Sequence, residues 1–309
     1  MSDSARAEAI LRAACGDRLR TSFPMAPLTT FRIGGAAALY LEPESDADLV
    51  AVAQAVSQDD LPYVVIGKGS NVLVSDRGFD GLVLRLGRGY RWVARDGLRL
   101  TAGGSMPLPA LAGVALRHAL DGLAFGVAIP ATLGGAVKMN AGAHGGQMAD
   151  VLLDVEVFRL EEGRVDRVPA AQAGFSYRHS ELPSDAVVTG AEFQLRSGDP
   201  VTIRAAMDEA RAWRRRTQPL AEPNCGSVFK NPVDGHAAPL IEQAGMKGAR
   251  VGSVQVSTKH ANFIVADEGA HAEDVLALID LVRRTVESRT GVVLEPEVRL
   301  IGGFDRVGG

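Results

Sequence analysis

The segment IPATLGGAVKMNAGAHGG, residues 129–146, is almost devoid of side-chain bulk, because five of its residues are glycine and four are alanine. Each glycine in an ordered backbone costs roughly 0.5–1 kcal/mol relative to alanine. A second glycine-containing segment, GKGSNVLV, lies at residues 67–74. Backbone N–H groups of such loops can converge on phosphate oxygens, so the two segments favour a diphosphate ligand. Tight turns are the alternative explanation, because neither segment has the GxGxxG or GxxxxGKS/T spacing of common nucleotide-binding loops.

The length and charge of the chain exclude several classes of protein. It has 309 residues, enough for two or three domains, and a net charge of −4 with basic residues scattered except near 211–216, which argues against nucleic acid. The longest uncharged runs, 100–116 and 122–137, are short for a membrane span. The first twenty residues carry Asp, Glu and Arg where an export signal needs an apolar core. We therefore expect a cytoplasmic protein with no nucleic-acid or membrane partner, and the sequence does not indicate its oligomeric state.

The two cysteines, Cys15 and Cys225, support neither a disulfide framework nor a metal site, because the chain has no CxxC motif and no Cys/His cluster. We expect no bound metal. Cys225 lies among small polar residues and is a candidate nucleophile. The alternative is a thiol that only fills space in the core.

Local patterns predict a chain of mixed helices and strands. Helices are expected at residues 4–19, 45–58, 107–120, 199–218 and 271–289. Ser45 and Asp48 have capping-box spacing at the start of the second helix. Short alternating runs at 82–104 are typical of antiparallel strands. Further strands are expected at 151–160, at 186–195 and at 291–303, where Glu295, Glu297 and Arg299 would share one face.

Three short stretches contain residues suited to chemistry. CGSVFKNP, residues 225–232, combines Ser227, Lys230 and Asn231, a set that can anchor a phosphate or sugar and present a hydroxyl as proton donor. FSYRHS, residues 175–180, contains Arg178, whose guanidinium matches a carboxylate. Glu297 is a candidate acid. Solvated turns and exposed strand ends are the alternatives for all three.

Six motifs, in order, give the chain a resemblance to a known family: GKGSNVLV, IPATLGGAVKMNAGA, FSYRHS, CGSVFKNP, KHANFI and LEPEVRLIG. Over residues 29–302 the chain resembles the UDP-N-acetylenolpyruvoylglucosamine reductases, also called UDP-N-acetylmuramate dehydrogenases. It lacks the tyrosine-bearing loop of the family's longer branch. The resemblance implies an α+β fold, with a two-subdomain FAD-binding fold of the vanillyl-alcohol-oxidase (PCMH) type and a C-terminal α+β substrate domain. The implied parts are a helical extension at 1–20, FAD-binding subdomain 1 at 21–80 with the strand 291–303 returning to it, FAD-binding subdomain 2 at 81–210, and a substrate-binding domain at 211–290.

The resemblance also implies the chemistry. Noncovalent FAD takes hydride from NADPH and passes it to UDP-N-acetylglucosamine enolpyruvate, giving UDP-N-acetylmuramate for peptidoglycan synthesis. In that reaction Arg178 faces the substrate carboxylate, Ser227 donates a proton, and Glu297 is the catalytic glutamate. Glu295 is set aside because the family's acid immediately precedes Val-Arg. We expect Glu297 to be buried and to be protonated or bonded to a donor, because an ionised carboxylate repels a developing enolate.

The family's binding residues map onto two sets of positions. FAD is implied to contact Gly67, Lys68, Gly69, Ser70, Asn71, Ile129, Pro130, Thr132, Gly134, Gly135, Asn140 and Gly142. The UDP-sugar is implied to contact Lys230, Asn231, Asn262 and Arg214.

Two departures from the family pattern affect the cofactor region. Ala131 replaces the usual Gly of IPGT, and His144 stands where Tyr is common. Two other functions stay open at this level. One is a different FAD-dependent oxidase of the same fold, with flavin attached through His144 or His179, and the other is a noncatalytic nucleotide-binding module. Flavin that stays with the denatured chain indicates the oxidase, and sugar-nucleotide binding without NADPH turnover indicates the module.

Overall fold

The computed structural model describes residues 3–304, which divide into two compact units. Unit 1 comprises residues 1–21, 39–68 and 81–214, and unit 2 comprises residues 22–38, 69–80 and 215–309, each including only its described residues. The chain changes unit several times, so neighbouring residues of one motif can belong to different units.

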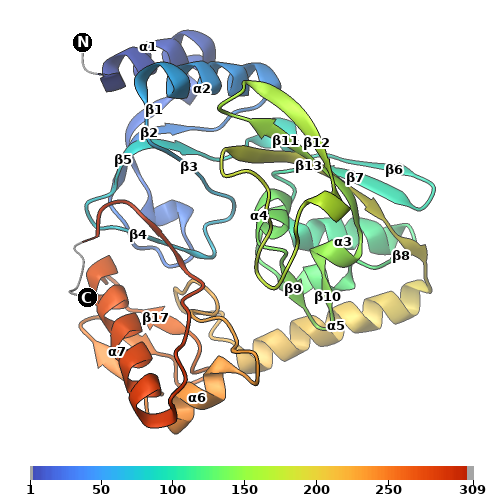
Figure 1. Ribbon diagram of the computed structural model, residues 1–309. Helices are drawn as coiled ribbons and strands as arrows, with labels where there is room; N and C mark the ends of the chain where they lie inside the picture. Colours follow the sequence, from blue (N-terminus) through green and yellow to red (C-terminus); the bar gives the residue numbers. More distant parts are fainter. Residues whose placement is uncertain (1–2, 305–309) are drawn as a thin grey trace. The chain divides into compact units, whose positions relative to one another are not determined.

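Unit 1 contains a five-stranded antiparallel sheet in the order β12-β11-β13-β7-β6 (Figure 1). Its strands are β6 (Val93–Asp96), β7 (Arg99–Gly103), β11 (Leu152–Arg159), β12 (Arg164–Pro169) and β13 (Ala186–Gln194). The helices α3 (Leu108–Arg117) and α4 (Leu133–Lys138) share an apolar core with this sheet. The strands predicted at 151–160 and 186–195 are confirmed.

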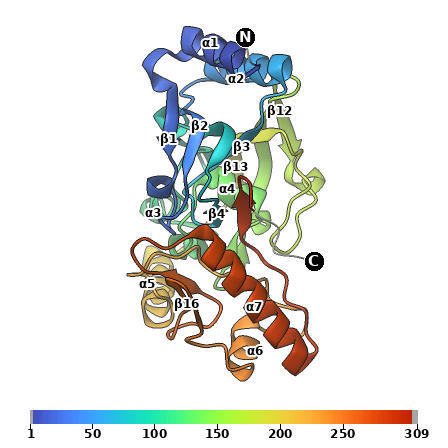
Figure 2. The ribbon, with the colours of Figure 1, turned by 90° about the vertical axis from the view of Figure 1, so that its left-hand side faces the viewer.

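Helices α1 (Asp3–Cys15) and α2 (Asp46–Asp59) lie side by side, as both ribbon views show (Figure 1, Figure 2). The predicted capping box at the start of α2 is confirmed, because the Ser45 hydroxyl accepts from Asp48 N while Asp48 accepts from Ser45 N. Such a cap contributes about 1 kcal/mol. Leu49 and Val52 of α2 are fully buried against Phe158 of β11 and its neighbours.

A four-stranded sheet has the order β1-β2-β5-β3, formed by β1 (Arg20–Pro24), β2 (Ala36–Leu41), β3 (Tyr63–Val65) and β5 (Phe79–Leu84). The expectation that every run from residue 82 to 104 is antiparallel is wrong for β5, which pairs with β3 in parallel. Parallel strands need a long crossover connection, because a tight hairpin turn joins antiparallel strands only. Residues 66–78, which connect β3 to β5, are long enough for such a crossover.

Unit 2 is built around the long helix α7 (Ala272–Thr290) and a three-stranded sheet of β15 (Arg250–Val251), β16 (Val254–Val256) and β17 (Ile264–Ala266). Figure 2 shows α7 beside this sheet and near α6 (Ala237–Gln243). The predicted spacing of the apolar face is confirmed, since Val275, Ile279, Val282 and Val286 are all buried. Each such side chain contributes roughly 1.5–3 kcal/mol by leaving water.

The strand predicted at 291–303 is much shorter in the structure. Only β18 (Arg299–Ile301) is a strand, and it pairs in parallel with β4 (Val72–Val74). Before β18, the chain bonds instead to the segment that carries Ser227, where Pro296 forms an isolated antiparallel bridge with Phe229. Glu295 and Glu297 therefore lie outside the strand.

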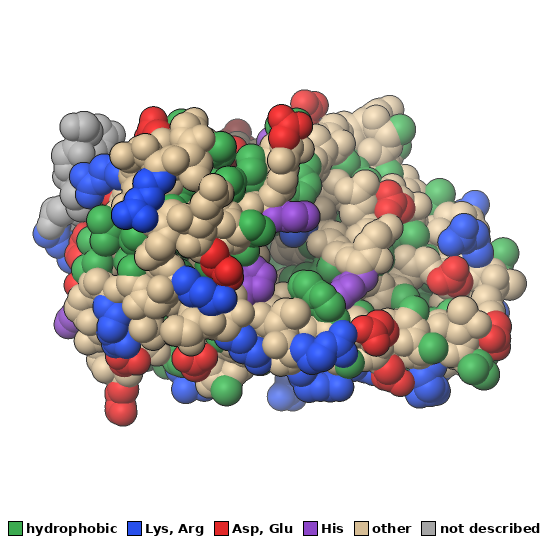
Figure 3. Space-filling model, turned by 90° about the horizontal axis from the view of Figure 1, so that it is seen from below, with side chains coloured by type: hydrophobic (Ala, Val, Ile, Leu, Met, Phe, Trp, Pro, Cys, Tyr) green, Lys and Arg blue, Asp and Glu red, His purple; other side chains and the backbone are tan. Residues whose placement is uncertain are grey.

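The remaining long helix, α5 (Pro200–Thr217), buries one stripe, Ile203, Met207 and Ala210, and leaves most of its other residues exposed. On the face drawn in Figure 3, basic and acidic side chains are interspersed. Within residues 3–304, every helix is too short or too polar to cross a membrane.

Candidate active site

The glycine loop at 67–71 is shaped by contacts that leave no room for side chains. Gly69 has φ +67°, and a Cβ there would lie 2.1 Å from the Leu28 carbonyl oxygen and 2.9 Å from Thr29 Cα. The Gly69 carbonyl also accepts from Thr30 N at 2.9 Å. All of these atoms belong to unit 2. Glycine is therefore required at position 69 by the protein itself.

In unit 1, Gly67 lies against the start of α4. A Cβ on Gly67 would approach Thr132 Oγ1 to 2.3 Å, and Thr132 is the N-cap residue of that helix. Gly135 behaves differently, because a Cβ there would meet only Thr132 Oγ1, at 3.5 Å. The open space beside exposed Gly135 fits a ligand that needs close approach to backbone, as a dinucleotide cofactor does.

Arg178 occupies a tight turn that is bonded to the glycine segment. Ser176 and His179 exchange both backbone hydrogen bonds, and Arg178 between them has φ +57°. Its Nη1 donates to the Gly142 carbonyl at 3.2 Å. Side-chain hydrogen bonds also tie Asn140 to Ser176 O. Arg178, the residue assigned to the substrate carboxylate, therefore lies in unit 1 together with two of the residues assigned to the cofactor, Asn140 and Gly142.

Asn140 is the buried centre of this arrangement. Its Nδ2 donates to Ser176 O and to Gln147 Oε1, and its Oδ1 accepts from Ala149 N at 3.0 Å. The residue is 3% exposed. Its side chain therefore shapes the glycine segment from inside, whichever ligand the segment holds.

His144, where the family pattern departs, packs against α5. Its ring meets Trp213 edge-on, with centroids 5.1 Å apart. Arg214, the next residue on α5, is partly buried, and this burial lowers its guanidinium pKa. Ala131 contributes to the apolar core of unit 1. The hairpin of β9 (Gly142–Ala143) and β10 (Gly146–Gln147) is thus anchored through an aromatic contact.

Unit 2 brings Ser227 and Glu297 onto adjoining segments. Val228 O accepts from Glu297 N at 2.7 Å, and Lys230 N donates to Glu295 O at 2.9 Å. Ser227 and Glu297 are both half-buried, so Glu297 is less buried than expected. Asn71 Nδ2 donates to the Glu297 carbonyl at 3.1 Å, which connects the glycine loop to the same segment.

The remaining polar residues near Ser227 have distinct surroundings. Lys230 Nζ pairs with Glu295 Oε1 at 2.6 Å, so the acid that sequence analysis set aside is an ion-pair partner. Asn231 is exposed, and its Oδ1 accepts from Ala237 N at the start of α6. Asn262 is 4% exposed and bonds Phe229.

Sequence analysis missed Asn224, which shapes the approach to Ser227. Its Oδ1 accepts from Gly226 N at 2.9 Å, and its Nδ2 donates to Glu222 O at 2.7 Å. An Asn that bonds the N–H two residues later forms an Asx turn. The Asn-Cys-Gly sequence, with Gly226 at φ +80°, is the signal that could have identified it.

Cys225 is a buried core residue. Burial raises the pKa of its thiol, and the protonated thiol is a poor nucleophile. Cys225 packs in the apolar core of unit 2. The hypothesis of a nucleophilic Cys225 therefore loses its support.

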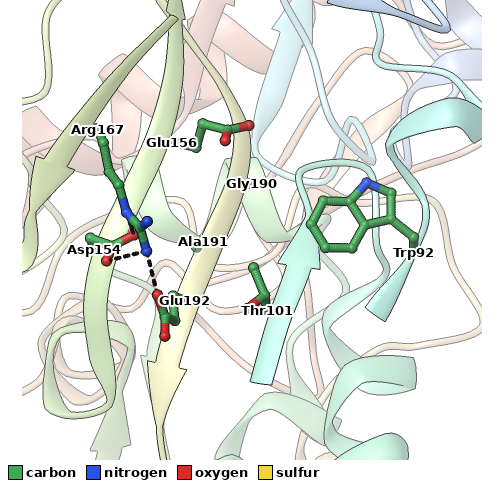
Figure 4. Close-up of a pocket in the computed structure, with 8 residues that line it drawn as sticks. All are labelled: Trp92, Thr101, Asp154, Glu156, Arg167, Gly190, Ala191 and Glu192. Atoms are coloured by element: carbon green, nitrogen blue, oxygen red, sulfur yellow. Dashed lines mark hydrogen bonds and ion pairs between the residues drawn. The ribbon is translucent and has the colours of Figure 1, made fainter. Parts of the chain in front are cut away.

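A cavity of about 220 Å³ lies on the five-stranded sheet, apart from the residues considered so far. It is lined by Trp92, Thr101, Asp154, Glu156, Arg167, Gly190, Ala191 and Glu192 (Figure 4). Arg167 already pairs with Asp154 and Glu192, and Thr189 donates to Glu156. Its acids are thus partnered within the sheet. No His, Cys, Asp and Glu cluster suited to a metal ion occurs within residues 3–304.

Comparisons with known proteins cover nearly the whole chain. Residues 37–168 match the family model "FAD binding domain", and residues 218–301 match "UDP-N-acetylenolpyruvoylglucosamine reductase, C-terminal domain". The chain is 48% identical to the UDP-N-acetylenolpyruvoylglucosamine reductase of Heliobacterium modesticaldum over 281 residues, which cover 90% of this chain and 89% of that protein.

Solved structures agree with this similarity. The UDP-N-acetylenolpyruvylglucosamine reductase of Thermus caldophilus superposes with a TM-score of 0.78 at 35% identity, covering 92% of this chain and 98% of that chain. A berberine bridge enzyme variant, described as a reticuline dehydrogenase, gives a TM-score of 0.50 at 12% identity, covering 63% of this chain and 44% of that chain. The second likeness concerns the fold alone.

Proposed function

The chain belongs to the UDP-N-acetylenolpyruvoylglucosamine reductase family, and from this premise we propose how its residues divide the work of the reaction. The protein is an FAD-dependent, NADP-linked oxidoreductase that reduces UDP-N-acetylglucosamine enolpyruvate to UDP-N-acetylmuramate in peptidoglycan precursor synthesis. The α+β fold with an FAD-binding region of the PCMH type is confirmed, and so are FAD and NADPH as cofactors.

Bound FAD supplies hydride transfer between NADPH and the enolpyruvyl double bond. In our proposal the glycine loops, Gly67–Asn71 and Ile129–Gly142, hold the cofactor by backbone approach, supported by the open space beside Gly135. The close contacts of Gly67 and Gly69 keep the two loops in shape. The proposal divides the chain into a helical extension at 1–20, FAD-binding subdomain 1 at 21–80 with residues 291–303 returning to it, FAD-binding subdomain 2 at 81–210 and a substrate-binding domain at 211–290.

Negative charge that develops on the substrate must be stabilised and then quenched by a proton. In our proposal Arg178 faces the substrate carboxylate. Its guanidinium suits this role because it is a permanent cation with a fork geometry. Ser227 donates the proton to carbon. Glu297, on the segment bonded to Val228, is protonated or bonded to a donor so that it supports the enolate without repelling it.

One observation carries this assignment: the 2.7 Å hydrogen bond from Glu297 N to Val228 O fixes the backbones that bear Ser227 and Glu297 next to each other. A proton donor and an acid on two hydrogen-bonded segments, here Ser227 and Glu297, can act on the same carbon centre. The UDP-sugar then contacts Lys230, Asn231 and Arg214, whereas Asn262, the fourth residue of the implied set, is 4% exposed and bonds the Phe229 backbone. We further propose that the enzyme works in the cytoplasm.

The test separates the two half-reactions under anaerobic conditions. NADPH should bleach the flavin absorbance, and UDP-N-acetylglucosamine enolpyruvate should restore it. Ser227→Ala should keep the first step and slow the second by about 10²- to 10⁴-fold, the usual contribution of a positioned proton donor. Reoxidation at the unaltered rate would remove Ser227 from the mechanism.

A further inference from the structure

The loop that carries Ser227, residues 225–232, is held on one side by the buried side-chain amide of Asn262. Asn262 Oδ1 accepts from Phe229 N at 2.9 Å, and Asn262 Nδ2 donates to Phe229 O at 2.8 Å. The backbone carbonyl of Asn262 also accepts from Val228 N at 2.9 Å. The Asn262 side chain thus pairs with Phe229 as a neighbouring strand would. Ser227 lies two residues before that pairing.

The opposite side of the same loop is bonded to the segment that bears Glu297. Val228 O accepts from Glu297 N, and Lys230 N donates to Glu295 O. Val228 and Phe229 are 1% and 2% exposed, so this stretch has little freedom to move. Upstream, Asn224 Oδ1 accepts from Gly226 N. The backbone of Ser227 is therefore confined between two asparagine anchors, Asn224 and Asn262.

We propose that Asn262 is a positioning residue, which orients the Ser227 hydroxyl by pairing with the Phe229 backbone. This inference rests on the proposed role of Ser227 as proton donor. Asn262 is only 4% exposed, and both polar atoms of its side chain are engaged with Phe229. Asn262 therefore acts on the substrate through Ser227 and not by contact with the diphosphate.

The experiment uses Asn262→Asp in the full-length holoenzyme. A protonated carboxyl group preserves both hydrogen bonds to Phe229, whereas the ionised form sets a second acceptor against the Phe229 carbonyl. The rate of flavin reoxidation by substrate should therefore fall as the pH rises and the introduced acid ionises, by about 10- to 100-fold, the loss typical of small misplacements of a reacting group. The substrate Kd, measured from the flavin spectrum, should stay within about threefold of the wild-type value. Flavin reduction by NADPH should be unchanged.

Ser257→Ala provides the matched control. Ser257 is 2% exposed, and its hydroxyl accepts from Lys259 N and His260 N in the turn before Asn262. It bonds neither Val228 nor Phe229. Ser257→Ala should lower the melting temperature without changing the reoxidation rate. If Asn262→Asp does not fold, Asn262→Gln, which moves the amide by one methylene, is measured in its place.

The outcomes separate this proposal from the one it rests on. If Asn262 acts through Ser227, adding Asn262→Asp to the Ser227→Ala enzyme should lower its rate of flavin reoxidation by less than about twofold. A Kd raised tenfold or more at an unchanged saturating rate would make Asn262 a direct substrate ligand and overturn the proposal. Equal slowing by Ser257→Ala, or full additivity with Ser227→Ala, would also overturn it. An unchanged rate in Ser227→Ala alone rejects the donor role instead.

Discussion

Replacing Gly69 by alanine tests whether backbone crowding alone accounts for the glycine loop. Gly69 has φ +67°, a conformation that costs an L-residue roughly 1–2 kcal/mol. The added methyl would also lie 2.1 Å from the Leu28 carbonyl oxygen, so the backbone must shift, which costs roughly a further 1–3 kcal/mol. Gly69→Ala should therefore destabilise the protein by about 2–5 kcal/mol.

Gly269→Ala is the control for this change. Gly269, also in unit 2, has φ +76°, and a Cβ there meets no atom within 4 Å. Its substitution carries only the conformational cost of roughly 1–2 kcal/mol. Both variants are compared by thermal unfolding of the apoprotein, where 1 kcal/mol corresponds to about 2–4 °C in chains of 150–250 residues, and by the FAD retained after purification. Gly69→Ala should lower the melting temperature more than Gly269→Ala, by the additional steric cost of about 1–3 kcal/mol, and should retain less FAD. Equal losses would refute the steric argument.

Four further predictions follow from particular side chains. Arg18 donates two hydrogen bonds to Asp48 and lowers the pKa of that carboxyl to about 2; because the folded-state pKa is depressed, the pair stabilises the fold fully above about pH 4, and this contribution declines below that pH and is lost as the pH falls through 2. Asp48→Asn should accordingly destabilise the protein by up to about 2 kcal/mol at pH 7, reduced by solvent screening at Arg18, with a difference from wild type in melts at pH 2.5 that is about a third as large. Cys225 should resist iodoacetamide at pH 8 in the folded protein and react in urea, and mass spectrometry that finds it alkylated in the native state contradicts its burial. Arg178→Lys should slow flavin reoxidation by substrate about 10²-fold while leaving flavin reduction by NADPH intact, whereas Arg164→Lys, at an exposed ion pair, should change neither rate. Acid precipitation should release all flavin into the supernatant, and flavin that remains on the chain would indicate covalent attachment.

Local sequence rules located most helices and strands because their signals lie within a few residues. The capping box of α2 needs only Ser45 and Asp48, and the buried face of α7 needs only its own periodicity. The pairing direction of β5 and the length of the last strand were predicted wrongly. Both depend on partners outside the predicted segment, β3 for β5 and the segment that carries Ser227 for the last strand, and no pattern within the segment specifies them.

The sequence by itself determined the family, the FAD-dependent chemistry and the residue types available for it, because ordered motifs preserve the identities that a reaction requires. Only the tertiary structure decided how those residues are held. It paired Lys230 with Glu295, connected Asn71 to Glu297, and turned the Asn262 amide towards Phe229. Asn140 likewise became an internal support of the Arg178 turn. An asparagine reads the same in sequence whether it faces a ligand or the backbone, because its amide bonds whichever partner the fold brings within about 3 Å.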